Sequence, residues 1–271
     1  MLKKTKYKII LILPLILCLT LLGLLFYLFI EEITATFQIY EEAYLLTLIT
    51  IIKILIVLLM GIYLINKWFK QQEIYFSDIL FLIGSVFLVL IIGKLFDFLL
   101  YFINIQISSE LLLFFAKIRY IIIIINLLPM IYLSLEMILF YLSVAKPQSS
   151  LKEKNKREGI KKKSIIIITI IELSIVLIAP TYKALFYILP FLIIPSLIMI
   201  VWVFAFAYKN EKLTEINTLT VSIGWALYLS TTIFRSLGQN IVDLPIFLSI
   251  SEILEIISFL VIFIGFMKKK V

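Results

Sequence analysis

Long apolar runs separated by short polar segments repeat along the whole chain. Runs such as "IIIIINLLPMIYL" and "FLIIPSLIMIVWVFAFA" do not alternate apolar and polar positions, as the strands of a membrane β-barrel would. A helix of about 20 apolar residues crosses the hydrocarbon core because it satisfies its own backbone hydrogen bonds. The pattern therefore predicts an all-α integral membrane protein, a polytopic helical bundle of about eight transmembrane helices. The helices are expected at 9–30, 43–65, 79–103, 111–145, 164–180, 184–208, 216–237 and 247–267.

The composition leads to the same conclusion. Hydrophobic residues make up 63% of the 271 positions, and the mean hydropathy is +1.16. Soluble domains use roughly 45–50% apolar residues, and a single core could not bury the excess present here. The lipid bilayer is therefore the expected surrounding of this chain.

Lysine and arginine are concentrated in alternate polar segments. These are "MLKKTKYK", "NKWFKQQE", "AKPQSSLKEKNKREGIKKKS", "YKNEKLTE" and "MKKKV", whereas the intervening segments are acidic or nearly neutral. Loops on the cytoplasmic side carry the excess of basic residues. This distribution favours an even number of crossings in the cell membrane, with the N- and C-termini both cytoplasmic and the first helix uncleaved.

The segment 146–163 divides the chain near its middle. It separates the first four helices, in residues 1–145, from the last four, in residues 164–271. Because it is basic, Lys146–Lys163 is expected to be a cytoplasmic loop that attracts anionic lipid headgroups or a cytoplasmic protein. The net charge of +8 is spread over such loops, which argues against nucleic acid as a partner.

The two halves share a weak internal similarity. "SSELLL" and "ISEILE", and likewise Lys94 and Arg235, are separated by about 141 residues. Two parallel four-helix repeats would produce such an offset. Chance would also produce it, because Leu, Ile, Lys and Glu dominate the composition, and both interpretations stay open.

Charged residues inside the predicted helices are the candidate functional residues. Each costs roughly 2.5–3.5 kcal/mol at the centre of a membrane helix, so each needs a charged partner or water. These residues are Lys53, Lys94, Asp97, Glu136, Glu172, Arg235, Glu252 and Glu255.

The predicted depth divides these candidates into two groups. Lys53, Glu136 and Glu172 belong to the middle or inner half of the membrane, and the other five belong to the outer half. One interpretation is an outward-facing polar vestibule above a buried gate, in which Lys53 pairs with Glu136 or Glu172. The other is that the outer charges extend to the interface and that Lys53 forms a structural ion pair with a glutamate.

Several chemistries are disfavoured by what the sequence lacks. It contains no histidine, and it has neither a Walker loop nor a GxGxxG motif. Histidine-ligated metal sites and Ser–His or Cys–His hydrolases are excluded on this ground. The single Cys18 forms no disulfide framework. No catalytic, cofactor-binding or metal-binding residue is therefore assigned, and enzymatic activity is the least favoured function.

Three functions remain. A small-molecule or ion transporter, resembling a permease in mode of action, would use the buried Lys–Glu pair. A membrane-embedded sensor or receptor-like module would bind a ligand at the outer charges and signal through a partner docked on Lys146–Lys163. A non-catalytic subunit or scaffold of a membrane complex would use its helices for assembly alone.

Overall fold

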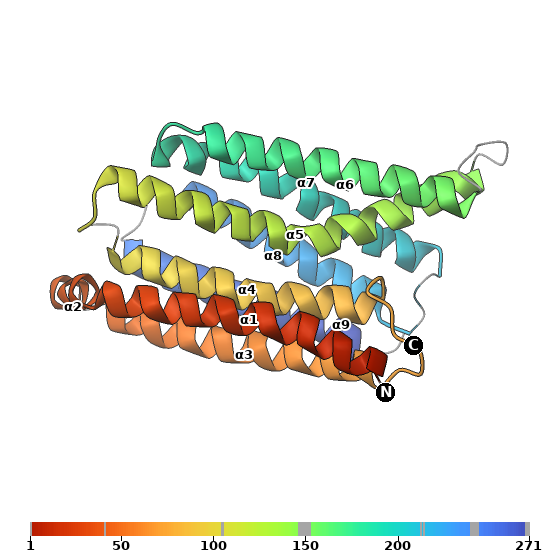
Figure 1. Ribbon diagram of the computed structural model, residues 1–271, viewed down its shortest axis with the longest axis horizontal. Helices are drawn as coiled ribbons and strands as arrows, with labels where there is room; N and C mark the ends of the chain where they lie inside the picture. The colour runs from red at the N-terminus through yellow and green to blue at the C-terminus, as the bar shows by residue number, and fades with distance from the viewer. Residues whose placement is uncertain are drawn as a thin grey trace. The chain divides into compact units, whose positions relative to one another are not determined.

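The computed structural model describes residues 2–40, 42–103, 106–145, 153–211, 213, 215–238 and 244–268 (Figure 1). Within these ranges the chain forms α-helices and no β-strand. The helices are α1 (Leu2–Leu28), α2 (Ile30–Ile39), α3 (Ala43–Phe69), α4 (Ile79–Ile103), α5 (Ser109–Ala145), α6 (Lys154–Ile178), α7 (Tyr182–Lys209), α8 (Thr218–Gly238) and α9 (Leu244–Met267). The predicted all-α class is confirmed.

Five of the described helices are long and apolar enough to cross a membrane. The crossing segments are Tyr7–Leu28, Ala43–Phe69, Ile79–Ile103, Ser109–Val144 and Ile246–Met267. Large apolar side chains on them are exposed, such as Leu13 at 62% and Leu59 at 67%, and a bilayer would cover this surface. The chain is therefore a multi-pass membrane protein. The three further crossings, the cytoplasmic position of both termini and the cell membrane stay predictions.

Most predicted helix positions agree closely with the structure. Helix α1 begins at Leu2, seven residues before the predicted start at 9, and there are two larger exceptions. The predicted helix at 79–103 coincides with α4, and those at 111–145 and 247–267 begin within three residues of α5 and α9. The first exception is the polar segment at 31–42, expected as a loop, because most of it forms α2. The hydroxyl of Thr36 in α2 donates to the carbonyl of Phe102 at 2.6 Å, and the two aromatic rings of Phe37 and Phe102 stack at 4.7 Å. These contacts hold α2 against the end of α4.

The second exception is the start of α6. The basic segment 146–163 was expected to be a loop, but α6 begins at Lys154. Arg157 donates to the hydroxyl of Ser143 at 3.2 Å, and Lys161 contacts Glu136 on α5. These side chains find partners on α5 only if the segment is helical. Residues 146–152, the rest of the predicted loop, lie outside the described residues.

By packing, the chain forms two compact units. Unit 1 contains Met1–Asn126 and Val242–Glu252, and unit 2 contains Leu127–Ile241 and Ile253–Val271. Helices α5 and α9 therefore each contribute to both units. This division does not test the two predicted four-helix repeats, which stay a prediction.

Helix α4 is the central element of unit 1. Its neighbours α1 and α3 run alongside it (Figure 1), and its side chains Ile83, Phe87 and Leu99 are completely buried. At Gly84, an added Cβ would lie 2.8 Å from Cδ1 of Ile65 on α3. The absence of a side chain at Gly84 lets the Ile65 side chain pack against the backbone of α4.

In unit 2, close backbone contacts join α7, α8 and α9. The hydroxyl of Ser222 on α8 donates to the carbonyl of Val201 on α7 at 3.0 Å. A Cβ at Gly224 would lie 2.7 Å from the backbone nitrogen of Ile262 on α9. Small residues thus allow tight helix packing in both units.

Candidate functional site

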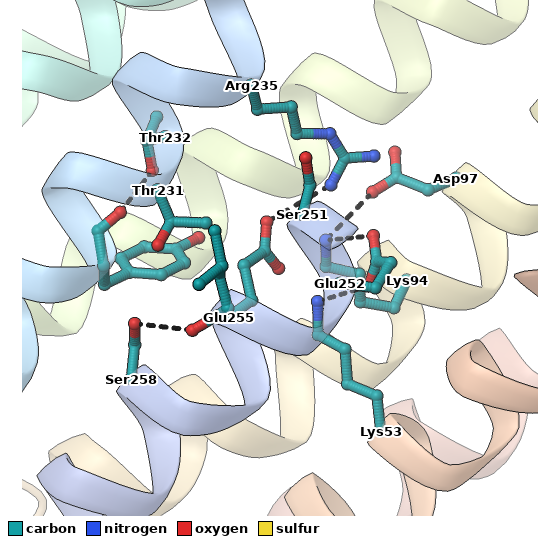
Figure 2. Close-up of polar contacts among 12 residues, drawn as sticks. Lys53, Lys94, Asp97, Thr231, Thr232, Arg235, Ser251, Glu252, Glu255 and Ser258 are labelled. Atoms are coloured by element: carbon teal, nitrogen blue, oxygen red, sulfur yellow. Dashed lines mark hydrogen bonds and ion pairs between the residues drawn. The ribbon is translucent and has the colours of Figure 1, made fainter. Parts of the chain in front are cut away.

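Lys53 and Glu252 form a buried ion pair that joins α3 to α9. The Lys53 side chain is 0% exposed and that of Glu252 is 5% exposed, and Nζ lies 2.5 Å from Oε2 (Figure 2). Charge-assisted hydrogen bonds of this kind are the strong ones in proteins. The two residues are 199 positions apart in the chain, so the pair links distant segments of unit 1.

Lys94 on α4 contacts the same glutamate from another side. Its Nζ lies 3.4 Å from Oε1 of Glu252 and 3.8 Å from Oδ2 of Asp97. Lys94 and Asp97 are three residues apart, so they share a face of α4, as the spacing predicts. Glu252 therefore lies between two lysines on two different helices.

Arg119 on α5 completes this group. Its Nε and Nη2 donate to the two carboxylate oxygens of Asp97, the second at 2.6 Å. This two-pronged contact matches the planar guanidinium to the carboxylate. A Cβ at Gly93, one turn before Asp97, would lie 3.4 Å from Nη1 of Arg119. The guanidinium of Arg119 therefore packs against the backbone of α4 at Gly93.

We call these five residues the charge cluster: Lys53, Lys94, Asp97, Arg119 and Glu252. The cluster contains three cationic and two anionic side chains from α3, α4, α5 and α9. All of its members belong to unit 1. Removing one member of an ion pair buried to this degree destabilises a protein, because the other charge is then buried without compensation.

The cluster lies deep within its helices. Lys53, Lys94 and Glu252 are each eight to ten residues from the nearer end of their helix. At 1.5 Å per residue this is about 12–15 Å from the nearer helix end. Lys53 and Glu252, which the sequence assigns to different depths, are in contact through the ends of their side chains, and the division of the candidates by depth stays a prediction.

A second buried ion pair lies in unit 2. Nη1 of Arg235 on α8 donates to Oε1 of Glu255 on α9 at 3.2 Å, and the Glu255 side chain is 5% exposed (Figure 2). The hydroxyl of Thr231, one turn before Arg235, donates to the carbonyl of Leu227 at 2.9 Å. Arg235 and Glu255, both predicted candidates, are therefore brought together.

Glu136 has a different partner from the predicted one. Lys161 on α6 contacts Glu136 on α5, and it also donates to Glu158 at 2.7 Å and to the hydroxyl of Tyr132 at 2.9 Å. Burial lowers the pKa of Lys161, but hydrogen bonds to the two carboxylates outweigh this effect and raise it above the ordinary value. The prediction that Lys53 pairs with Glu136 or Glu172 is wrong, since its ion-pair partner is Glu252.

Glu172 on α6 differs from the other buried carboxylates. The residue is 6% exposed, and its Oε2 atom has no hydrogen-bond partner among the described residues. It lies on the buried face of α6 that includes Lys161 and Val176. Among the predicted candidates it is the one carboxylate for which the described part of the chain supplies no cation.

The cations Arg119 and Lys161 were missed from the sequence, and with them Glu158 and Tyr132, which are partners of Lys161. Arg119 gives a detectable signal, since it is a charge within the predicted helix at 111–145. Lys161 gives none, because it stands in a basic run in which every lysine looks equally exposed. Among the described residues no group of three His, Cys, Asp or Glu side chains could hold a metal ion.

Comparison of the chain with protein-family models, with curated proteins and with solved structures gives no match. The functional argument therefore rests on the geometry of the charge cluster and on the other buried charges.

Proposed function

We propose that this protein is a transporter of ions or small charged molecules, permease-like in its mode of action, and that the Lys53–Glu252 pair is its gate. The observation that carries the proposal is one buried carboxylate between two lysines, near the middle of the predicted span. Oε2 of Glu252 lies 2.5 Å from Lys53 and its Oε1 lies 3.4 Å from Lys94. A charge group at this depth is expensive for a protein that uses its helices only for packing.

The arrangement also supplies a physical mechanism. Glu252 can strengthen its contact with Lys94 as it weakens its contact with Lys53, so the carboxylate keeps a cation while the pair opens. Lys53 then needs a new partner, which an anionic solute or water would supply. Lys94 is coupled in turn to Asp97, and Asp97 to Arg119. A charged solute that replaces one partner would shift the remaining contacts along this series, which links solute binding to helix movement.

The sensor alternative is favoured by one other observation. Lys156, Lys162 and Lys163 are exposed on the first turns of α6, whereas Lys161 is buried. A cytoplasmic partner or anionic headgroups would therefore meet an ordered basic helix face, and Lys161 would not take part. Neutralising Lys162 and Lys163 together should abolish partner capture if the sensor interpretation holds.

Flux measurements on purified protein in lipid vesicles test the transport proposal. Internal pH dyes and ion-selective dyes would report the movement of H⁺, Na⁺, K⁺ and Cl⁻ under imposed gradients. We expect flux of at least one probe ion above that of empty vesicles, and loss of that flux in Lys53→Met and Glu252→Gln.

The exposed pair Glu153 and Lys156, with side chains 61% and 54% exposed, provides matched controls. Glu153→Gln and Lys156→Met remove the same charges outside the charge cluster and should leave flux unchanged. Wild-type flux in a folded Glu252→Gln protein, as judged by a monodisperse size-exclusion profile, would contradict the proposal. A wild-type protein that moves none of the probe ions would also contradict it for these ions.

A further inference from the structure

Glu172 is a buried acidic side chain whose chemistry the charge cluster does not use. It belongs to unit 2, and it is the only acidic residue in the apolar part of α6, which runs from residue 164 to residue 178. The residue is 6% exposed, and Oε2 has no hydrogen-bond partner among the described residues.

Other buried carboxylates have a cation of the protein beside them. Glu252 contacts Lys53 at 2.5 Å, and Glu255 contacts Arg235 at 3.2 Å. These are the arrangements by which proteins normally bury a negative charge. A carboxylate buried to the same extent without such a contact must obtain its counter-charge from elsewhere.

The charged residues of the other unit 2 helices are either paired with one another or located near helix ends. On α6 itself, Lys161 is eleven residues earlier, about 16 Å along the helix axis. Lys161 contacts Glu136, the only charged residue of α5 between 127 and 145. In α7 the charged residues are at positions 183 and 209, near its two ends, and α8 and the unit 2 part of α9 contain only the paired Arg235 and Glu255.

We propose that Glu172 is the binding site for a small monovalent cation, a proton or Na⁺, taken from the aqueous phase. A bound cation would supply the counter-charge that the described side chains do not provide. Ionisable residues inside membrane helices commonly mark such ion pathways. The role of this ion as the coupling ion of transport rests on the proposed function, but the binding itself does not.

Labelling with a hydrophobic carbodiimide tests the binding site directly. Dicyclohexylcarbodiimide enters the bilayer and reacts with a carboxyl group that carries a proton, whereas a carboxylate held by lysine or arginine is unreactive. Wild-type protein in Na⁺-free vesicles would be treated at about pH 6 and about pH 8, and the modified peptides would be identified by mass spectrometry. We expect modification at Glu172 and none at Glu252 or Glu255, and Glu172→Gln should lose the label.

Adding Na⁺ distinguishes the two cations. Suppression of labelling by NaCl, but not by an equal concentration of choline chloride, identifies Na⁺ as the ligand. Labelling that is unchanged by NaCl identifies the proton. Absence of labelling at Glu172 at both pH values, in a protein that is labelled there after denaturation, would overturn the site. The labelling assay does not measure flux, so it can support the cation site even if the flux assay contradicts the transport proposal.

Discussion

The charge cluster of unit 1 and Glu172 of unit 2 represent two ways of placing charge inside apolar helices. In the cluster, each of the two carboxylates contacts two cations: Glu252 contacts Lys53 and Lys94, and Asp97 contacts Lys94 and Arg119. Glu172 is buried to a similar extent, but the described residues supply no hydrogen-bond partner for its Oε2 atom. Substitutions at these residues test whether the difference in environment produces a difference in the free energy of unfolding.

The difference suggests separate tasks for the two regions. Charges that compensate one another fix the positions of α3, α4, α5 and α9, and the Glu252 carboxylate can move from one lysine toward the other without losing its cation. A carboxylate without a protein cation contributes little to helix packing and is available to an ion from solution. The comparison therefore predicts that neutralising a cluster residue affects stability strongly, whereas neutralising Glu172 does not.

The largest effect is expected for Glu252→Gln. This change leaves Lys53, whose side chain is 0% exposed, without its carboxylate, and breaking a buried pair in this way costs about 3–5 kcal/mol. Thermal and denaturant unfolding of the purified protein in detergent would measure the loss. A double variant that exchanges the two charges, Lys53→Glu with Glu252→Lys, should recover part of the lost free energy of unfolding. Equal instability of the double and single variants would argue against a direct Lys53–Glu252 contact.

A smaller effect is expected for Asp97→Asn. The variant loses the negative charge of the two-pronged contact with Arg119, but the asparagine keeps a carbonyl oxygen that can still accept a hydrogen bond from the guanidinium. The free energy of unfolding should fall by about 1–3 kcal/mol. The same unfolding assay measures it, with Glu153→Gln as the control. A loss larger than that of Glu252→Gln would place the centre of the cluster at Arg119 instead of at Glu252.

Lys161→Met should lower the free energy of unfolding by a still smaller amount, about 1 kcal/mol. The side chains of its partners Glu136 and Glu158 are 42% and 36% exposed, so solvent screens these ion pairs. The pKa of Lys161 is raised above its ordinary 10.5, so the stabilisation is complete below the unfolded-state value and is lost as the pH rises through the folded-state value. The stability difference between wild type and variant should therefore be constant between about pH 6 and about pH 9. A difference that disappears below about pH 9 would mean that Lys161 loses its proton too early for this account.

The smallest effect is expected for Glu172→Gln. The side chain keeps its size, and no protein contact of Oε2 is lost among the described residues. The free energy of unfolding should therefore change by less than about 0.5 kcal/mol. A loss comparable to that of Glu252→Gln would show that Glu172 is an integral part of helix packing, and the comparison of the two regions would fail.

Local patterns in the sequence predicted the local features of the structure. Apolar runs gave the helix positions, and the spacing of three residues placed Lys94 and Asp97 on one face of α4. The contact between Lys53 and Glu252 could not be predicted in this way, because two residues 199 positions apart carry no periodic signal. The segment that forms α2 was misread because its glutamates suggest a solvated loop, although Ile33, Thr36 and Phe37 have helical spacing.

Water access to position 53 shows whether the Lys53–Glu252 pair is a gate. Cys18 is the only cysteine, so Cys18→Ser with Lys53→Cys gives a single reactive thiol, and Cys18→Ser with Val57→Cys, one turn away and also buried, gives a matched control. A positively charged, membrane-impermeant thiol reagent would be added from each side of oriented vesicles. A gate predicts labelling of position 53 from both sides, at a rate that changes with the transported ion. Protection of position 53 from both sides in the folded protein would contradict the gate and make Lys53 a structural partner of Glu252.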